Sequence, residues 1–114
     1  FLESLAGRLR HHSPNTIVEP QAFLREMERV RRNGFAVNRG EWRESVCGVA
    51  APVREPGGRV IAAIGLSGPA DRLRPSTFRP FAEQLVEAAH AIGEALAGAS
   101  PQASENRAST RSIR

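Results

Sequence analysis

Four side chains in this sequence are of the types that bind metals or attack substrates: His11, His12, His90 and Cys47. Catalysis needs a nucleophile with an oriented base, or a metal ion with convergent ligands. The histidines have no carboxylate or cysteine at metal-ligand spacing, so we interpret them as solvated or capping residues. Cys47 is predicted to be a buried, unreactive thiol on the bulky face of a sheet. The sequence therefore predicts no catalytic residue, no metal site, no cofactor and no enzyme.

Other conspicuous residues also have structural interpretations. Gly57-Gly58 is predicted to be a hairpin turn and not a phosphate loop, because no helix start follows it. The arginines of the run 29–32 are predicted to form a solvated helix face, with an interface as the second interpretation. Trp42, in a polar turn, is predicted to be partly buried against the sheet, with a lid or a partner anchor as alternatives.

A β-hairpin is the strongest local pattern, with strands over 46–53 and 60–67 joined by a loop that contains proline and two glycines. Symmetric closure of the loop pairs Val53 with Val60 and Gly48 with Gly65. One face then gathers bulky apolar side chains: Cys47, Val49, Ala51, Val53, Val60, Ala62, Ile64 and Leu66. The other face carries mostly small ones: Val46, Gly48, Ala50, Pro52, Ile61, Ala63, Gly65 and Ser67. This second face has room for a ligand or for a closely packed helix.

The remaining elements must position this hairpin. We expect helices over 1–12, from Pro20 to the stop at Asn33-Gly34, and from a cap at Ser76 or Thr77 onward, and a strand over 35–37. The last helix presents an apolar stripe: Phe78, Phe81, Leu85, Ala88, Ala89, Ile92 and Leu96. The predicted fold is α/β of the α+β type, with an antiparallel sheet packed under this helix. We expect a domain over 1–97 and a disordered basic tail over 98–114.

Composition excludes several classes of protein. The 114 residues carry 16 arginines, no lysine and 12 acidic residues, for a net charge of +4. Half of that excess lies in the tail over 98–114, so the folded part has no basic stripe of the kind that binds nucleic acid. No stretch approaches the roughly 20 apolar residues that span a bilayer, and no signal peptide opens the chain. A single cysteine fits a reducing cytoplasm.

Several motifs occur together in a fixed order. They are a helix that ends in R-x-x-G-F-A (31–36), a G-E turn (40–41), an A-A-P-V strand (50–53), a hairpin glycine (58) and a strand that closes in S-G-P (67–69). In this order and spacing they resemble the carboxy-terminal part of the effector-binding domain of IclR-family bacterial transcription regulators. The resemblance covers roughly residues 16–96.

The resemblance implies a GAF-like domain that binds a small metabolite, often an organic or aromatic acid. It implies homodimers or homotetramers, and DNA binding through an amino-terminal winged helix-turn-helix that we do not find here. The chain would thus be an incomplete effector domain. Family contact positions, carried over one at a time, fall on Asn38, Gly48, Gly65 and Ser67. Cys47 adjoins a contact position but points to the other face by strand alternation.

Two further functions are considered beside an effector domain. One is a structural or oligomerisation module without a ligand, which would use the terminal helix and the sheet edge. The other is a cysteine redox enzyme of the GAF fold, which needs both a reactive and a resolving thiol. Cys47 is the only cysteine in the sequence, so the redox alternative is disfavoured.

Overall fold

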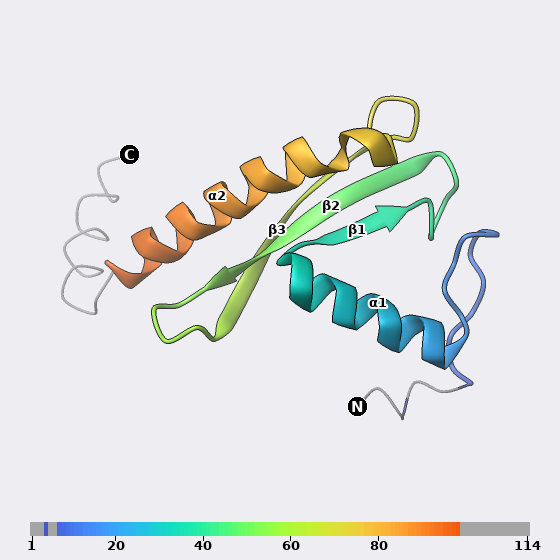
Figure 1. The fold of residues 1–114 in the computed structure, drawn as a ribbon, viewed down its shortest axis with the longest axis horizontal. Helices are drawn as coiled ribbons and strands as arrows, with labels where there is room; N and C mark the ends of the chain where they lie inside the picture. Colours follow the sequence, from blue (N-terminus) through green and yellow to red (C-terminus); the bar gives the residue numbers. More distant parts are fainter. Residues whose placement is uncertain (1–3, 5–6, 99–114) are drawn as a thin grey trace, which may run out of the picture.

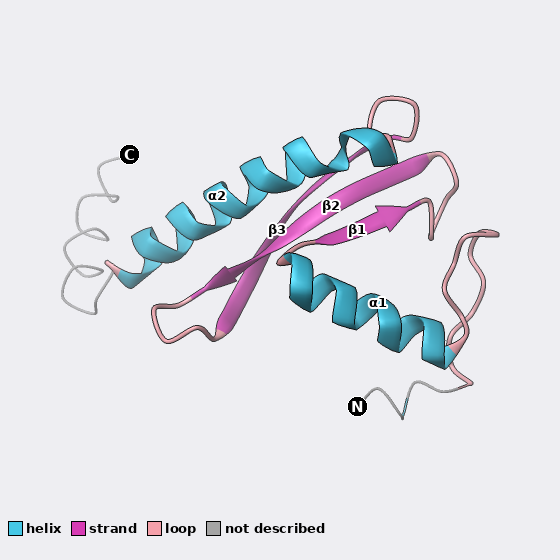
Figure 2. Ribbon diagram, in the orientation of Figure 1, coloured by secondary structure: helices cyan, strands magenta, loops and turns pink. Residues whose placement is uncertain are grey.

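The computed structural model describes residue 4 and residues 7–98, which form a three-stranded antiparallel sheet with two helices (Figures 1 and 2). The elements are α1 (Pro20–Asn33), β1 (Ala36–Arg39), β2 (Val46–Arg54), β3 (Val60–Pro69), a 3-10 turn (Pro75–Thr77) and α2 (Phe78–Ala97). The strand order is β1-β2-β3. The long helix α2 runs along the sheet, and α1 lies beside β1 (Figure 1). The predicted α+β architecture is confirmed.

The two ends of the chain differ from expectation or lie outside the described part. Residues 7–12 have turn, bend and irregular backbone where the end of a helix over 1–12 was expected. The predicted tail over 98–114 lies outside the described residues, apart from Gly98. Among the residues that the structure describes, neither helix has the length and apolar character needed to cross a membrane.

Both predicted ends of α1 are confirmed. Pro20 occupies the first turn, where its missing N–H costs nothing, and the carboxylate of Glu19 accepts bonds from the N–H groups of Gln21 (2.9 Å) and Ala22 (2.8 Å). Gly34 ends the helix at φ 79°, and its N–H donates to the carbonyl of Val30 at 2.8 Å. Glycine adopts this left-handed conformation without the steric cost of a Cβ.

The Glu19 cap makes the start of α1 sensitive to pH. The N–H bonds from Gln21 and Ala22, assisted by Arg25, hold the pKa of this exposed carboxyl below its ordinary value. Its stabilising effect is therefore complete above the unfolded-state pKa and is lost as the pH falls through the lower folded-state pKa. We expect the amide resonances of Gln21 and Ala22 to titrate together in that acidic range in an NMR pH series. Glu19→Gln should abolish this titration, and its persistence in that variant would refute the assignment.

The hairpin register differs from the predicted one by two residues. Val49 pairs with Leu66 and Gly48 pairs with Ser67. Two one-residue changes add up to this difference. The turn pairs Val60 with Arg54 instead of Val53, and the next pair is Val53 with Ala62, which leaves Ile61 between them as a bulge. A shift of two residues keeps the side chains of 46–53 and 62–67 on their predicted faces, because strand side chains alternate with a period of two. Val60, on the other side of the bulge, was predicted on the bulky face but pairs with Arg54 and so lies on the opposite face. The separation into a bulky and a small-residue face is therefore retained.

The core lies between β2 and α2. The four bulky-face residues of β2 are buried, and they pack with Leu73, Phe78 and Ala89 in two adjoining clusters. The predicted stripe of α2 is wrong in its last turns, because the buried residues there are Ala89 and Gly93, whereas Ile92 and Leu96 are exposed. The helix approaches the sheet through its small side chains, and this close approach turns the larger ones outward.

Candidate functional site

Three of the four predicted effector-binding residues form one row across the sheet. Asn38 of β1 pairs with Gly48 of β2, and Gly48 pairs on its other side with Ser67 of β3. Gly65 pairs with Ala50 in the next row of the same face. This is the small-residue face, since α2 packs against the opposite side of β2. The structure thus brings together all four residues that the sequence had singled out.

The two glycines of this face are not equivalent. A Cβ on Gly48 would lie 2.9 Å from the carbonyl oxygen of Leu66 and 3.3 Å from Oγ of Ser67. A Cβ on Gly65 would lie 3.4 Å from the carbonyl oxygen of Val49, an ordinary contact. Gly48 is also in the central strand, where its backbone groups belong to the ladder of the sheet and cannot serve a ligand. Glycine at position 48 therefore allows β2 and β3 to lie close together, whereas glycine at position 65 leaves open space on the small-residue face.

The polar groups of the face are a hydroxyl and an amide. Ser67 is exposed, and Asn38 is half-buried at the end of β1. The side-chain oxygen Oδ1 of Asn38 accepts a bond from the backbone N–H of Glu41 at 2.8 Å, which leaves the side-chain NH2 of Asn38 as the group to face a ligand. The hydroxyls of Ser13 and Thr16 donate to the carbonyls of residues 40 and 41, so the preceding loop fixes this turn in place.

The residues examined for catalysis lie apart from this row. No group of three metal-ligating side chains occurs among the described residues. Cys47 is buried on the opposite face, as predicted, and exposed His90 pairs with Glu94 at 3.1 Å on α2. The prediction for Trp42 is wrong: the side chain is 55% exposed, and the guanidinium of Arg43 stacks 4.5 Å from the centre of its ring.

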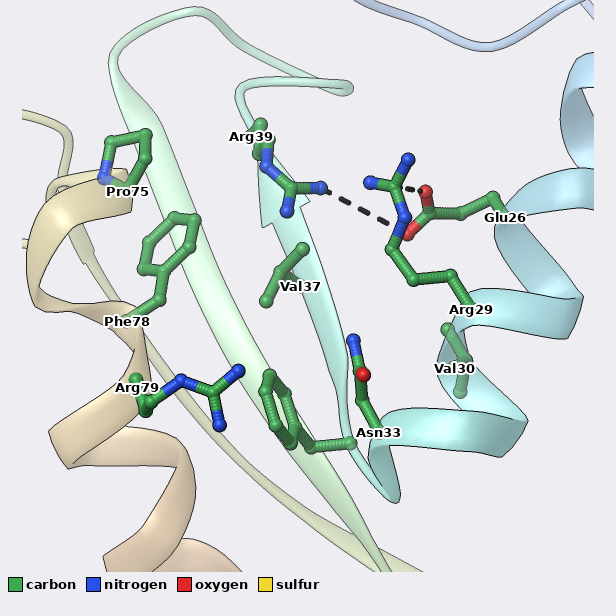
Figure 3. A pocket seen from close by; sticks show the side chains of 10 residues that line it. Glu26, Arg29, Val30, Asn33, Val37, Arg39, Pro75, Phe78 and Arg79 are labelled. Carbon is green, nitrogen blue, oxygen red and sulfur yellow. Dashed lines mark ion pairs between the residues drawn. The ribbon is translucent and has the colours of Figure 1, made fainter.

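A cavity of about 150 Å³ lies on the α2 side of the sheet, where α1, β1 and the start of α2 meet (Figure 3). Its walls carry three arginines, one glutamate, two phenylalanines and smaller side chains: Arg29, Arg39, Arg79, Glu26, Phe35, Phe78, Val30, Asn33, Val37 and Pro75. Val37 lines it and Asn38 does not, because neighbouring strand residues point to opposite faces. The cavity and the row of effector residues thus lie on opposite faces of the sheet.

Sequence reasoning missed this cavity. Arg31 and Arg32 are exposed, as the predicted solvated helix face requires, but Arg29 of the same run lines the cavity. Arg39 and Arg79 come from other elements far along the chain, so no local spacing connects the three. The available signal was the helical period of Glu26, Arg29 and Asn33, which places their side chains on one side of α1.

A family comparison agrees with the fold and with the motifs. The family described as "Bacterial transcriptional regulator IclR C-terminal" matches residues 2–94 of the chain. The chain belongs to the IclR C-terminal family. The matched residues include all three strands and the R-x-x-G-F-A, A-A-P-V and S-G-P motifs found above.

Individual relatives support the IclR assignment. The chain is 36% identical over 95 residues to the HTH-type transcriptional repressor AllR of Klebsiella pneumoniae, covering 83% of this chain and 35% of that protein. It therefore spans about a third of the length of such curated relatives.

Two solved structures share the fold. The transcriptional regulator YaiJ has a TM-score of 0.77 at 31% identity, over 84% of this chain and 53% of that one. The C-terminal domain of the Escherichia coli regulator KdgR has a TM-score of 0.72 at 26% identity, over 83% of this chain and 58% of that one.

Proposed function

We propose that this chain is the effector-sensing portion of a bacterial IclR-type transcription regulator, and that its small-residue face binds a small organic or aromatic acid. The observation that carries the proposal is the row of Asn38, Gly48 and Ser67 across three strands, on the face that α2 leaves free. The Ser67 hydroxyl and the Asn38 amide NH2 would donate to the acid, and Gly65 would leave space for it.

The wider setting is part of the same proposal. The protein acts in the cytoplasm, as a homodimer or homotetramer, and is not an enzyme. It contacts DNA through a winged helix-turn-helix outside the matched C-terminal family domain. Effector binding changes operator affinity only if the acid has different affinities for two arrangements of the regulator.

Ser67→Ala should weaken binding of the acid, because it removes a hydroxyl that donates to a charged oxygen. Loss of one such bond lowers affinity by about 10-fold. Gly65→Leu should abolish binding at this face, since its side chain would fill the open part of the face without entering backbone atoms. We suggest titrating the chain with malonate, lactate and benzoate by calorimetry, with amide chemical shifts to locate the site.

Ser45→Ala is a matched control, because Ser45 is exposed in the loop before β2 and away from the row. An acid that perturbs the amides of residues 38, 65 and 67, but binds Ser67→Ala and Gly65→Leu as tightly as the original chain, would contradict the site. A substitution at Gly48 would be a poor test, because it displaces the strand through Leu66.

A ligand-free oligomerisation module is the second candidate. Exposed apolar side chains on β3 and α2 favour it: Val60, Ile61, Leu66, Val86, Ile92 and Leu96. Light scattering with and without the acids separates the two functions. Assembly that is independent of acid, together with no binding across the panel, would favour the structural module over the sensor.

A further inference from the structure

The cavity between α1, β1 and α2 is electropositive. Three arginines and one glutamate line it, for a formal charge of +2. The Glu26 side chain, only 11% exposed, pairs with Nη1 of Arg29 at 3.3 Å and with Nη1 of Arg39 at 3.9 Å (Figure 3). A single carboxylate shared between two guanidinium groups leaves part of their hydrogen-bonding capacity free.

Arg79 is the cavity arginine without a carboxylate partner. Its guanidinium makes no ion pair with any residue that the structure describes. The guanidinium carbon lies 6.0 Å from the centre of the Phe35 ring, and in Figure 3 the side chain points from α2 toward β1. An aromatic neighbour holds the planar fork of an arginine without occupying its N–H groups, so those groups can meet a carboxylate.

The start of α2 adds to the positive field. Phe78 and Arg79 are the first two residues of this 20-residue helix, and both line the cavity. The 3-10 turn Pro75–Thr77 runs directly into them, the N–H of Phe78 donates to the carbonyl of Pro75, and Pro75 also lines the cavity. The first turn of a helix carries a partial positive charge, which favours an anion at this end.

The other walls are apolar and aromatic. Phe35, Phe78, Val30, Val37 and Pro75 provide them. A cavity of about 150 Å³ accommodates a single benzene ring. An inorganic anion would satisfy the arginines but leave these walls in contact with water, whereas a flat ring with one carboxylate satisfies both.

We propose that this cavity is a second ligand site, which binds one small aromatic carboxylate. The carboxylate lies on Arg79 and Arg39, and the ring lies against Phe35 and Phe78. The bound acid would contact α1, β1 and α2 together, and thus would stabilise their mutual arrangement. The site is on the opposite side of the sheet from Ser67 and does not depend on the effector-face assignment.

The test is a titration of the 114-residue chain with benzoate, followed by amide chemical shifts. We expect saturable shifts at the amides of residues 30, 37, 78 and 79, with a Kd on the order of 1 mM for so small a ligand. Arg79→Gln should raise that Kd by about 10-fold, because a charge-assisted hydrogen bond is lost. Benzamide, which has the same ring but no charge, should bind much more weakly.

Arg72→Gln is the matched control, since it removes one positive charge from the exposed turn that precedes α2. Ser67→Ala and Gly65→Leu should leave the cavity shifts unchanged, so failure of this site and failure of the effector face are distinguishable. The proposal is overturned if benzoate causes no shifts around the cavity well above the expected Kd. It is also overturned if Arg72→Gln weakens binding as much as Arg79→Gln does, or if benzamide binds as tightly as benzoate.

Discussion

Phe78→Ala is expected to lower the free energy of unfolding by about 3–5 kcal/mol. Phe78 is only 4% exposed, and its ring packs against Cys47, Val49 and Leu73 in one of the two core clusters. Removal of the ring loses its burial and leaves a void that the surrounding strands cannot close. Because small domains are stable by only about 5–15 kcal/mol, this one change should remove a large part of the total.

Urea denaturation followed by circular dichroism measures the change in stability. Ile92→Ala on the same helix is the control, because Ile92 is 38% exposed and should cost less than about 1.5 kcal/mol. Equal losses of unfolding free energy in the two variants would contradict the packing of α2 against the sheet through the side that carries Phe78.

Gly93→Val is expected to destabilise the fold by about 3 kcal/mol, at the upper end for overpacking. A Cβ at this position would lie 2.4 Å from the carbonyl oxygen of Arg54, a backbone atom at the end of β2. The helix and the strand must then move apart, which loosens the burial of Ala89 and Val53. Replacement of a glycine within a helix normally stabilises the helix, by up to about 1 kcal/mol. The expected loss of stability is therefore what remains after the steric clash has outweighed this gain.

The matched control is Ala95→Val, which places the same β-branched side chain on the exposed side of α2. We expect its free energy of unfolding to remain within about 1 kcal/mol of the original chain. If Gly93→Val were as stable as this control, the close contact between α2 and Arg54 would be wrong.

The hairpin illustrates how far the sequence could predict the structure. Alternation placed the side chains of 46–53 and 62–67 on their correct faces, because that assignment depends only on the parity of the residue number within each regular strand. Val60 was placed on the wrong face, because the bulge at Ile61 interrupts the alternation. The pairing of individual residues was wrong by two, because it depends on how the turn closes. The bulge at Ile61 is a property of both strands together, and no pattern in either strand indicates it.

The long helix gives a second example. Its apolar spacing correctly predicted an amphipathic helix, and it placed Phe78 and Ala89 on the buried side. Hydrophobicity alone also placed Ile92 and Leu96 there. The structure instead buries Gly93, because the distance between α2 and β2 is set by what fits beside Arg54.

The sequence by itself determined α1, α2, the hairpin strands, the two faces of the sheet and the IclR resemblance, which in turn implied the candidate residues Asn38, Gly48, Gly65 and Ser67. The elements and the faces follow from local periodicity, the resemblance follows from short motifs in a fixed order, and the candidate residues are what that resemblance implies. Only the tertiary structure decided the register, the distinct roles of the two glycines and the arginine-lined cavity. Glu26, Arg39 and Arg79 meet there because α1 and α2 pack beside the same strand. Such packing is fixed by contacts between distant segments, which local patterns do not encode.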